Sequence, residues 1–301
     1  MFQKKMGKLY ARKEALTGYL MISPLMIGLF VFFVYSFVLN IYYSLTNKST
    51  FGEPVFIGLK NYQKLFASDK FFSALSNTFL YVLICVPFVV VISLLLAYLL
   101  NQGVRGTGIY RTLIFIPAVT MPAAIGLIWK WILNYKFGIL NYVISALGGE
   151  PKAWLSDHKY VLFSVSAVLI WADISLRMII FLAGLQGIPK SLYEAAEIDG
   201  ANSTTKFFRI TLPILSPTIF FVTLMEMIGV FQIFDFIYLM IPVNSSGMPA
   251  ARSLVSLFYD EAFVRGNKGY GSAITVVLFL IIFILTLVQL KFQKKWVHTE
   301  G

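Results

Sequence analysis

The sequence is poor in charge and almost free of cysteine. Only 13% of its 301 residues are charged, whereas 58% are hydrophobic, and the mean hydropathy is +0.77. Such a chain has too little polar surface to cover a soluble globule, so lipid must be part of its solvent. Cys85, the single cysteine, can form no internal disulfide and has no partner at metal-ligand spacing. We therefore expect an integral membrane protein without disulfides or metal centres.

Motifs for nucleotide binding and catalysis are also missing. No G-x-x-x-x-G-K-[ST] sequence occurs, so the chain cannot cradle nucleotide phosphates in the P-loop manner. The two histidines, His158 and His298, are isolated, one in a predicted loop and one in the tail. The net charge of +11 comes from Lys and Arg at the ends of apolar runs, which indicates contact with membrane lipid and not with nucleic acid. We expect no enzyme and no cofactor bound by this chain.

Long apolar segments dominate what is present. A helix satisfies its own backbone hydrogen bonds, so a run of about 20 apolar residues can cross a bilayer as a helix. The sequence contains six such runs, at about 17–43, 78–100, 113–133, 161–185, 214–241 and 272–290. They predict an all-α membrane protein with six transmembrane helices in one domain, 17–292, between tails 1–16 and 293–301. Prolines in or near these segments predict kinks at Pro24, Pro87, Pro117, Pro122 and Pro217.

The distribution of Lys and Arg predicts the orientation of the chain in the membrane. Thirteen of these residues fall on the side of the two tails and ten on the other side, spread over longer loops. The N-terminal tail alone holds five of them just before the first apolar segment. Because basic residues favour the cytoplasmic side, both termini are predicted to be cytoplasmic. The first segment has no small-residue cleavage site and is expected to be retained as a span.

The loop 187–213, between the fourth and fifth segments, has the pattern of a helical hairpin. Pro189 ends the preceding span. Ser191 followed by Glu194 forms a capping box, which predicts that a short helix starts there. Gly200 then ends that helix. Because of the predicted orientation, this hairpin lies on the cytoplasmic side.

A second helix follows in the same loop. Asn202 or Ser203 can cap its start, and Pro213 permits the chain to turn into the fifth span. The two short helices present apolar residues, namely Leu192, Ala195 and Ala196 on the first and Phe207, Phe208 and Ile210 on the second. Apolar faces on a cytosolic loop need a protein partner.

The residues of this loop resemble the EAA loop of ABC importer permeases. Glu194-Ala195-Ala196 is followed after three residues by Gly200, then after nine by Ile210, and then by Leu212-Pro213. The resemblance implies the type I importer permease fold, with the hairpin as the coupling helix that docks into a cleft of a separate ATPase. The ATPase-coupling residues would then be Ser191, Glu194, Ala195, Ala196, Asp199, Gly200, Ala201, Ile210, Leu212 and Pro213.

The same resemblance implies a set of partners. The family precedent is a heterodimer of two related permeases, with two ATP-binding-cassette subunits that hold ATP and Mg. An extracytoplasmic solute-binding protein would deliver the substrate. The protein would then lie in the inner membrane of a bacterial or archaeal cell and move its substrate by alternating access.

Further motifs are similar to the carbohydrate branch of this family, in its first-permease type. They extend the resemblance over about residues 17–292 and imply that the substrate is a sugar. One segment departs from the family, because 243–249 stands where a tighter Gly-Gly-Pro is usual. The matching motifs are Phe56–Tyr62, Tyr110-Arg111, Gly138–Asn141, Phe234-Asp235 and Gly269–Ala273.

Ionisable residues inside the predicted spans are candidates for the substrate pathway. A charge at the centre of a span costs about 2.5–3.5 kcal/mol on insertion scales, so such residues usually mark a pathway or an ion pair. Asp173 and Arg177 lie one helical turn apart and can alternatively pair with each other. Glu226 has no partner nearby in the sequence. The candidates are Trp171, Asp173, Arg177, Glu226, Gln232 and Asp235.

The family register also marks positions that face the sugar in related permeases. On the fourth and fifth spans they fall at Leu169, Ala172, Asp173, Leu176, Glu226, Gly229, Val230 and Ile233. Several of these are apolar. Two alternatives therefore stay open: a permease of the same family for a sugar acid or phosphorylated polyol, with Arg177 as an anion contact, or an ion-coupled transporter or channel.

Overall fold

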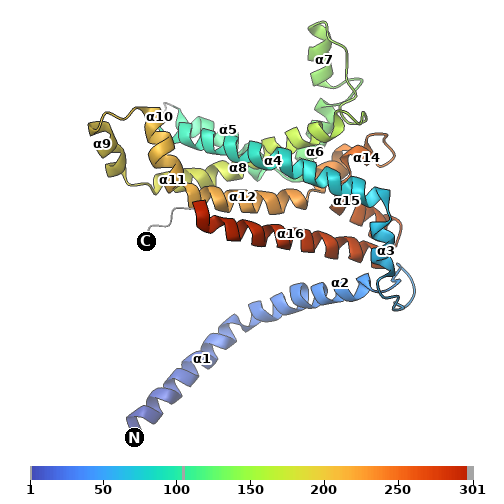
Figure 1. The fold of residues 1–301 in the computed structure, drawn as a ribbon, viewed down its shortest axis with the longest axis horizontal. Helices are drawn as coiled ribbons and strands as arrows, with labels where there is room; N and C mark the ends of the chain where they lie inside the picture. The colour runs from blue at the N-terminus through green and yellow to red at the C-terminus, as the bar shows by residue number, and fades with distance from the viewer. Residues whose placement is uncertain (1, 104–105, 297–301) are drawn as a thin grey trace.

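The computed structural model describes residues 2–103 and 106–296, so Arg105, His298 and the end of the tail 293–301 lie outside the described residues. Figure 1 shows a bundle of long helices, and the described part of the chain contains no strand. Four helical stretches are long and apolar enough to cross a membrane, and six are if each of two bent helix pairs counts as one span. The expected all-α membrane fold is therefore present.

Most of the chain is helical, and the elements follow the apolar segments closely. The first stretch continues as one helix through a π-helical turn, η1, and reads α1 (Phe2–Leu29), η1 (Phe30–Tyr35) and α2 (Ser36–Ser44). The remaining long helices are α4 (Asp69–Asn101), α5 (Thr107–Val119), α6 (Pro122–Ile132), α8 (Val161–Gln186), α12 (Ser216–Phe231) and α16 (Lys268–Trp296). The shorter ones outside the hairpin are α3 (Lys60–Phe66), α7 (Ile139–Ala146), α13 (Asp235–Met240), α14 (Met248–Ala251), α15 (Leu254–Tyr259) and η3 (Asp260–Val264).

Two of the apolar segments are broken where prolines lie. Between α5 and α6 the chain turns by 100°. Thr120 adopts an extended conformation there, and Pro122 opens the new helix. A second bend, of 66°, precedes α12, which has Pro217 in its first turn. Helices α1 and α4 continue unbroken through Pro24 and Pro87. A membrane helix tolerates an internal proline when other groups satisfy the carbonyl that proline frees.

The bundle is built around α4 and α8, which pack along each other. Helix α12 packs on α4, and α5 packs on α8. The larger apolar core includes Tyr81, Val165 and Phe231, and a second core near the hairpin includes Phe181 and Leu215. Cys85 is buried in the larger core as a free thiol.

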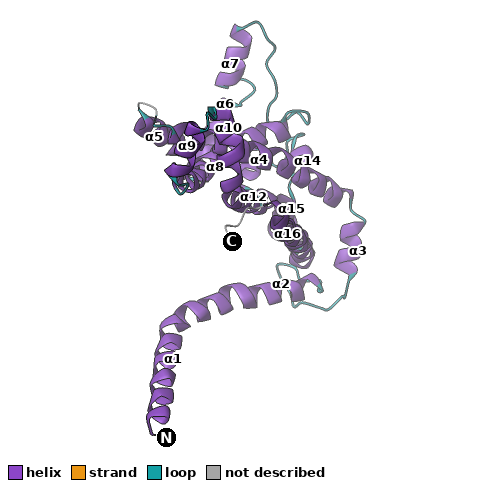
Figure 2. Cartoon of the chain, turned by 60° about the vertical axis from the view of Figure 1, so that its left-hand side comes forward, coloured by secondary structure: helices purple, strands orange, loops and turns teal. Residues whose placement is uncertain are grey.

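The N-terminal helix leaves the bundle. Figure 2 shows α1 pointing away from the other helices, whereas α2 lies beside α16. The α2 contact includes a ring contact between Phe37 and Phe279, at 4.8 Å, and a 2.9 Å hydrogen bond from Asn40 to Thr275. The large apolar side chains of α1 from Leu16 onward are exposed. Such a helix is suited to lipid or to another membrane subunit, not to water.

Hydrogen bonds at the C-terminal end of α2 explain two of the family motifs. The Asn61 amide donates hydrogen bonds to the carbonyls of Ser44 and Thr46, both at 2.8 Å. The backbone N–H of Gly269 donates to the Lys48 carbonyl at 2.7 Å. Asn61 and Gly269 therefore fasten the end of the first span to α3 and to the start of the last span.

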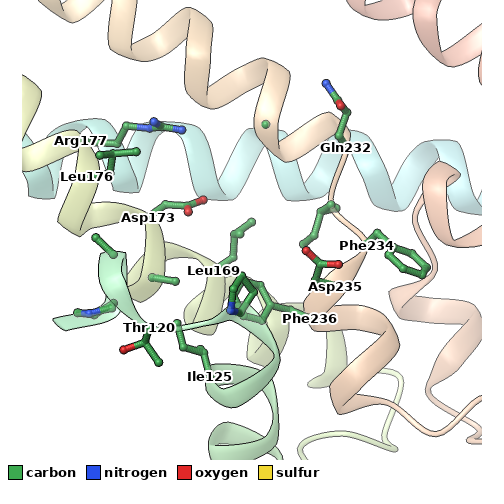
Figure 3. A pocket seen from close by; sticks show the side chains of 16 residues that line it. Thr120, Ile125, Leu169, Asp173, Leu176, Arg177, Gln232, Phe234, Asp235 and Phe236 are labelled. Carbon is green, nitrogen blue, oxygen red and sulfur yellow. The ribbon is translucent and has the colours of Figure 1, made fainter. Parts of the chain in front are cut away.

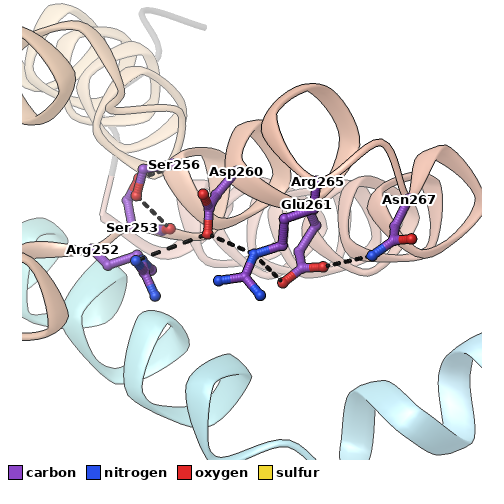
Figure 4. A network of polar contacts seen from close by, with 7 residues as sticks. All are labelled: Arg252, Ser253, Ser256, Asp260, Glu261, Arg265 and Asn267. Carbon is purple, nitrogen blue, oxygen red and sulfur yellow. Dashed lines mark hydrogen bonds and ion pairs between the residues drawn. The ribbon is translucent and has the colours of Figure 1, made fainter. Parts of the chain in front are cut away.

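A polar network links Arg252, at the end of α14, to η3 and to the residues just before α16 (Figure 4). The Arg265 Nε lies 3.3 Å from Asp260 Oδ2 and 3.4 Å from Glu261 Oε1. Asn267 donates to Glu261 at 3.3 Å, and Arg252 lies 3.9 Å from Asp260. Because each carboxylate faces an arginine, the network holds this connection together without an uncompensated charge.

Asn141, from the motif Gly138–Asn141, organises the segment around α7. Its side chain is 4% exposed. The amide nitrogen donates to the Tyr135 and Lys152 carbonyls, and the amide oxygen accepts from the Lys152 N–H and from Trp154 Nε1, all at 2.9–3.1 Å. One side chain therefore bonds to the chain segments before and after α7.

Replacing Asn141 with alanine is expected to loosen this loop and to leave the helical bundle intact. The substitution removes the hydrogen-bond partner of several partly buried groups, and losing such bonds costs about 1–3 kcal/mol. Limited proteolysis of the purified protein should then cut between residues 133 and 160 at least tenfold faster, because about 1.4 kcal/mol corresponds to a factor of ten. The control is Asn244→Ala, at an exposed position of a different loop. Equal cleavage of both variants would contradict the expected role.

Candidate functional site

A cavity of about 370 Å³ lies where α8 meets the break between α5 and α6 and the break between α12 and α13. The break between α5 and α6 supplies Thr120, and the break between α12 and α13 supplies Gln232 and Asp235. Irregular backbone at membrane depth is tolerated only where protein buries it or where it lines a water-filled space. Two such breaks at one cavity therefore indicate a built site and not a packing defect.

Four of the predicted pathway residues line this cavity: Asp173, Arg177, Gln232 and Asp235. Figure 3 shows the carboxylates of Asp173 and Asp235 turned toward the space between them, from opposite walls. Gln232 points away from them, and its amide nitrogen donates to the Ile228 carbonyl at 3.2 Å. The walls are completed by apolar and aromatic residues, among them Leu169, Ile125, Phe234 and Phe236.

Arg177 and Glu226 form a buried ion pair between α8 and α12. The Arg177 Nε lies 2.6 Å from Glu226 Oε2, and the two side chains are 13% and 1% exposed. The alternative pairing of Arg177 with Asp173 is wrong, since no ion pair joins them within 4.0 Å. The helix-to-helix approach explains the difference, because it brings a carboxylate 49 positions away in the chain onto the guanidinium.

Glu226 therefore has a partner that its sequence neighbourhood did not reveal. It lies behind the cavity wall and is not among the lining residues. Its second oxygen, Oε1, is buried, and no group in the described part of the chain meets it with hydrogen-bond geometry. Asp173 lies beside both members of the pair, within electrostatic range. The group thus combines two carboxylates with one guanidinium.

Trp171 lies outside the cavity, and its ring packs against Trp129 at 5.6 Å. Of the positions marked by the family register, Val230 is buried in the core. The ones that line the cavity are Leu169, Ala172, Asp173, Leu176, Gly229 and Ile233. Sequence reasoning did not find the wall made by Pro117, Thr120 and Ile125. The sequence did indicate this wall indirectly, because Pro117 and Pro122 predicted a kink in this segment.

The loop 187–213 forms the expected hairpin. It contains α9 (Lys190–Ile198), α10 (Ser203–Lys206), a π-helical turn η2 (Phe207–Thr211) and α11 (Leu212–Ile214). Figure 1 places it at one end of the bundle. The hairpin connects α8 directly to α12, and both of these helices border the cavity.

The ends of α9 differ in part from the expectation. The predicted capping box does not form, because the helix begins at Lys190 with Pro189 as its N-cap, and no side chain caps it. Ser191 is therefore already inside the helix. Gly200 ends α9 as expected, with φ +76°. The Ala201 N–H bonds to the Ala196 carbonyl at 2.9 Å, which completes a Schellman motif.

The second part of the hairpin is capped by Asn202, as one of the two alternatives predicted. Its side-chain oxygen accepts from the Thr205 N–H at 2.8 Å. An ion pair of 2.7 Å between Lys206 and Glu197 then joins the two halves, and Lys206 holds the pKa of the Glu197 carboxyl below its ordinary value. Tyr193 and Thr211 are linked through their hydroxyl groups at 2.9 Å. The hairpin is thus a preformed unit.

One face of the hairpin is attached to the bundle and the other is free. Phe207 packs on Tyr98 of α4 with ring centroids 4.8 Å apart, and Leu212 packs on the second core. On the free face, Glu194 is exposed, as is Ile198, at 88%. The other coupling residues are placed as follows: Ser191, Ala195, Asp199 and Gly200 are exposed, and Ala196, Ala201, Ile210, Leu212 and Pro213 are half-buried.

Comparison with known proteins agrees with this arrangement. Residues 64–298 match the family described as the binding-protein-dependent transport system inner membrane component. The chain belongs to this family. The probable ABC transporter permease protein YesP of Bacillus subtilis is 36% identical over 96% of this chain and 94% of its own length. The arabinooligosaccharides transport system permease protein AraP of the same organism is 34% identical, over 94% and 89% of the two chains.

A solved structure shares the fold. It is a bacterial alginate ABC transporter in complex with an alginate pentasaccharide-bound periplasmic protein, and one of its chains superposes with a TM-score of 0.86. The identity is 21%, and the match covers 95% of this chain and 97% of the other. The predicted permease fold and the expectation of a transport subunit without enzyme activity of its own are both confirmed. The ion-coupled transporter or channel is not supported.

Proposed function

We propose that this permease forms one half of a sugar pathway and that the hairpin 187–213 transmits the movement of a separate ATPase to it. The observation that carries the proposal is the direct connection of one free, preformed hairpin to the two helices that border the cavity. A force on the hairpin acts on α8 at one end and on α12 at the other.

Docking to the ATPase involves the free face of α9. Glu194 supplies a charge for an ion pair, and the small Ala195 permits close approach. Ile198 adds an exposed apolar contact. ATP and Mg are held by the two ATPase subunits, so this chain contributes no nucleotide site. The Arg177–Glu226 pair joins α8 to α12 inside the membrane, so both helices move together when the hairpin is displaced.

Sugar transport is supported by the relatives and by the cavity. AraP, named for arabinooligosaccharides, aligns over nearly the whole chain. The cavity combines polar side chains with the rings of Phe234 and Phe236, a mixture that suits the hydroxyl groups and apolar faces of a sugar. The other half of the pathway comes from a second, related permease.

The proposed orientation places the hairpin and both chain ends in the cytoplasm. The start of α1, the end of α16 and the hairpin lie toward the same end of the molecule in Figure 1. Five basic residues in the N-terminal tail favour the cytoplasmic side. The opposite end, with α3 and α14, then meets the extracytoplasmic solute-binding protein.

Charge reversal on the free face of α9 tests the coupling role. The variant Glu194→Arg, co-expressed with the neighbouring permease and ATPase genes, is expected to retain about tenfold less ATPase on purification. The reason is that loss of a charge-assisted contact and the introduction of like charges cost at least about 1.4 kcal/mol. Hydrolysis stimulated by the binding protein should fall with it.

The matched control is Glu53→Arg, which reverses an exposed charge in the loop between α2 and α3. It should retain the ATPase fully. If wild type co-purifies with no ATPase, the importer mechanism is wrong. If Glu194→Arg keeps both the ATPase and its stimulation, the hairpin couples through other residues.

A further inference from the structure

We propose that the cavity selects uncharged, hydroxyl-rich solutes and excludes anionic ones, because Asp173 and Asp235 give it a net negative charge while Arg177 is committed to Glu226. This inference rests on the proposed pathway and narrows its substrate class. It disfavours the sugar acid and the phosphorylated polyol. The fold does not decide whether anionic solutes are excluded, since one structural neighbour is involved in the import of the acidic polysaccharide alginate.

The charges at the cavity do not cancel. Its ionisable lining residues are Asp173, Arg177 and Asp235. The guanidinium of Arg177 is neutralised from behind by Glu226, at 2.6 Å. What remains is the carboxyl groups of Asp173 and Asp235, which come from different walls of the space that a solute would enter (Figure 3). An anion in that space would meet no uncompensated positive charge and would be repelled by the remaining negative charge.

Arg177 carries a charge that Glu226 already compensates. Its Nε lies 2.6 Å from Glu226 Oε2, and the Glu226 side chain is 1% exposed, so the guanidinium cannot move onto an anion without leaving that carboxylate unpaired. A buried carboxylate without a counter-charge is costly. The guanidinium also lies against α12, since its terminal nitrogen is 3.9 Å from where a Cβ on Gly229 would stand.

The carboxylates of the site accept hydrogen bonds. Asp173 and Asp235 accept only, when ionised. Both line the cavity. Sugar hydroxyls can donate to them, whereas the ionised carboxylates and phosphates of an anionic solute cannot.

The test measures the charge preference of the cavity without needing the natural substrate. In a Cys85→Ser background, Leu176→Cys places one thiol in the cavity wall. The assembled permease–ATPase complex is treated with three methanethiosulfonates of similar size: trimethylammonium-ethyl, hydroxyethyl and sulfonatoethyl. Rates are divided by those of Leu147→Cys, at a position that is 82% exposed in another part of the chain.

The neutral and cationic reagents are expected to react with the cavity thiol at least about tenfold faster than the anionic one, after this normalisation. The double variant Asp173→Asn/Asp235→Asn should bring the three rates within about twofold of one another. Asp69→Asn removes an exposed carboxylate outside the cavity and should leave the ratio unchanged.

Two failures are distinguishable. Equal rates for the anionic and neutral reagents in the wild-type cavity would overturn the charge selection and leave the proposed pathway in place. No reaction with any reagent, while Leu147→Cys reacts, would show that the cavity is closed to solutes, and the proposed pathway would fail together with this inference.

Discussion

Replacing Arg177 with methionine is expected to destabilise the permease by about 3–5 kcal/mol. Methionine keeps most of the volume of arginine but removes the cation, so Glu226 is left in the core with a 1% exposed side chain and no counter-charge. The measurement is the thermal midpoint of the purified complex, followed by size-exclusion chromatography after heating.

The double variant Arg177→Met/Glu226→Leu is the decisive control. It removes both charges and replaces them with apolar groups, a change that is often nearly neutral for a buried pair. We expect it to recover most of the lost stability, while its transport activity stays low because α8 and α12 have lost their polar link. A double variant as unstable as Arg177→Met alone would mean that packing, and not the unpaired carboxylate, causes the loss.

This pair also marks what the sequence could not provide. The costs of burying charge identified Asp173, Arg177 and Glu226 from hydropathy alone. Their pairing depends on how α8 and α12 approach each other, which is a tertiary property. Local spacing favoured the i,i+4 partner Asp173, and the neighbouring helix supplied a closer one. A rule that considers only one helix must miss such a pair.

The helices and the hairpin were more accessible to sequence reasoning, because local chemistry determines them. Gly200 and Asn202 have the predicted functions, since a left-handed residue and a side-chain cap depend on a few neighbours. Ser191 failed as a cap because Pro189, with its fixed φ, already caps the helix two residues earlier. The start of α9 was thus decided by competition between two nearby N-cap residues, Pro189 and Ser191.

The bend between α5 and α6 could be predicted from the sequence only in part. Pro117 and Pro122 predicted a kink, but not the 100° turn that opens the cavity wall at Thr120. Proline removes a hydrogen-bond donor, and this alone does not set the angle, as the unbroken helix through Pro87 demonstrates. The angle is set by what the freed segment packs against. Here α6 packs against α13, and a Cβ on Gly126 would stand 3.0 Å from Leu239.

Gly269→Ala is expected to have the other large effect, a loss of about 3 kcal/mol with detachment of the first span. A Cβ at this position would overlap the Thr46 carbonyl oxygen and stand 3.1 Å from both the Lys48 nitrogen and the Tyr43 carbonyl oxygen. All three are backbone atoms, which cannot move aside as a flexible side chain would. The 2.7 Å bond from the Gly269 N–H to the Lys48 carbonyl would break as well.

The matched control is Gly28→Ala, where an added Cβ meets nothing within 4 Å in the described structure. Alanine in a helix is favoured over glycine by about 1 kcal/mol, so this variant should be at least as stable as wild type. The readout is thiol cross-linking of Asn40→Cys to Thr275→Cys in a Cys85→Ser background, since the native side chains are 2.9 Å apart. Gly269→Ala should lose the cross-link and Gly28→Ala should keep it. An intact cross-link in Gly269→Ala would mean that the backbone around Thr46 can adjust, and that the α2–α16 contact does not depend on the close approach at this glycine.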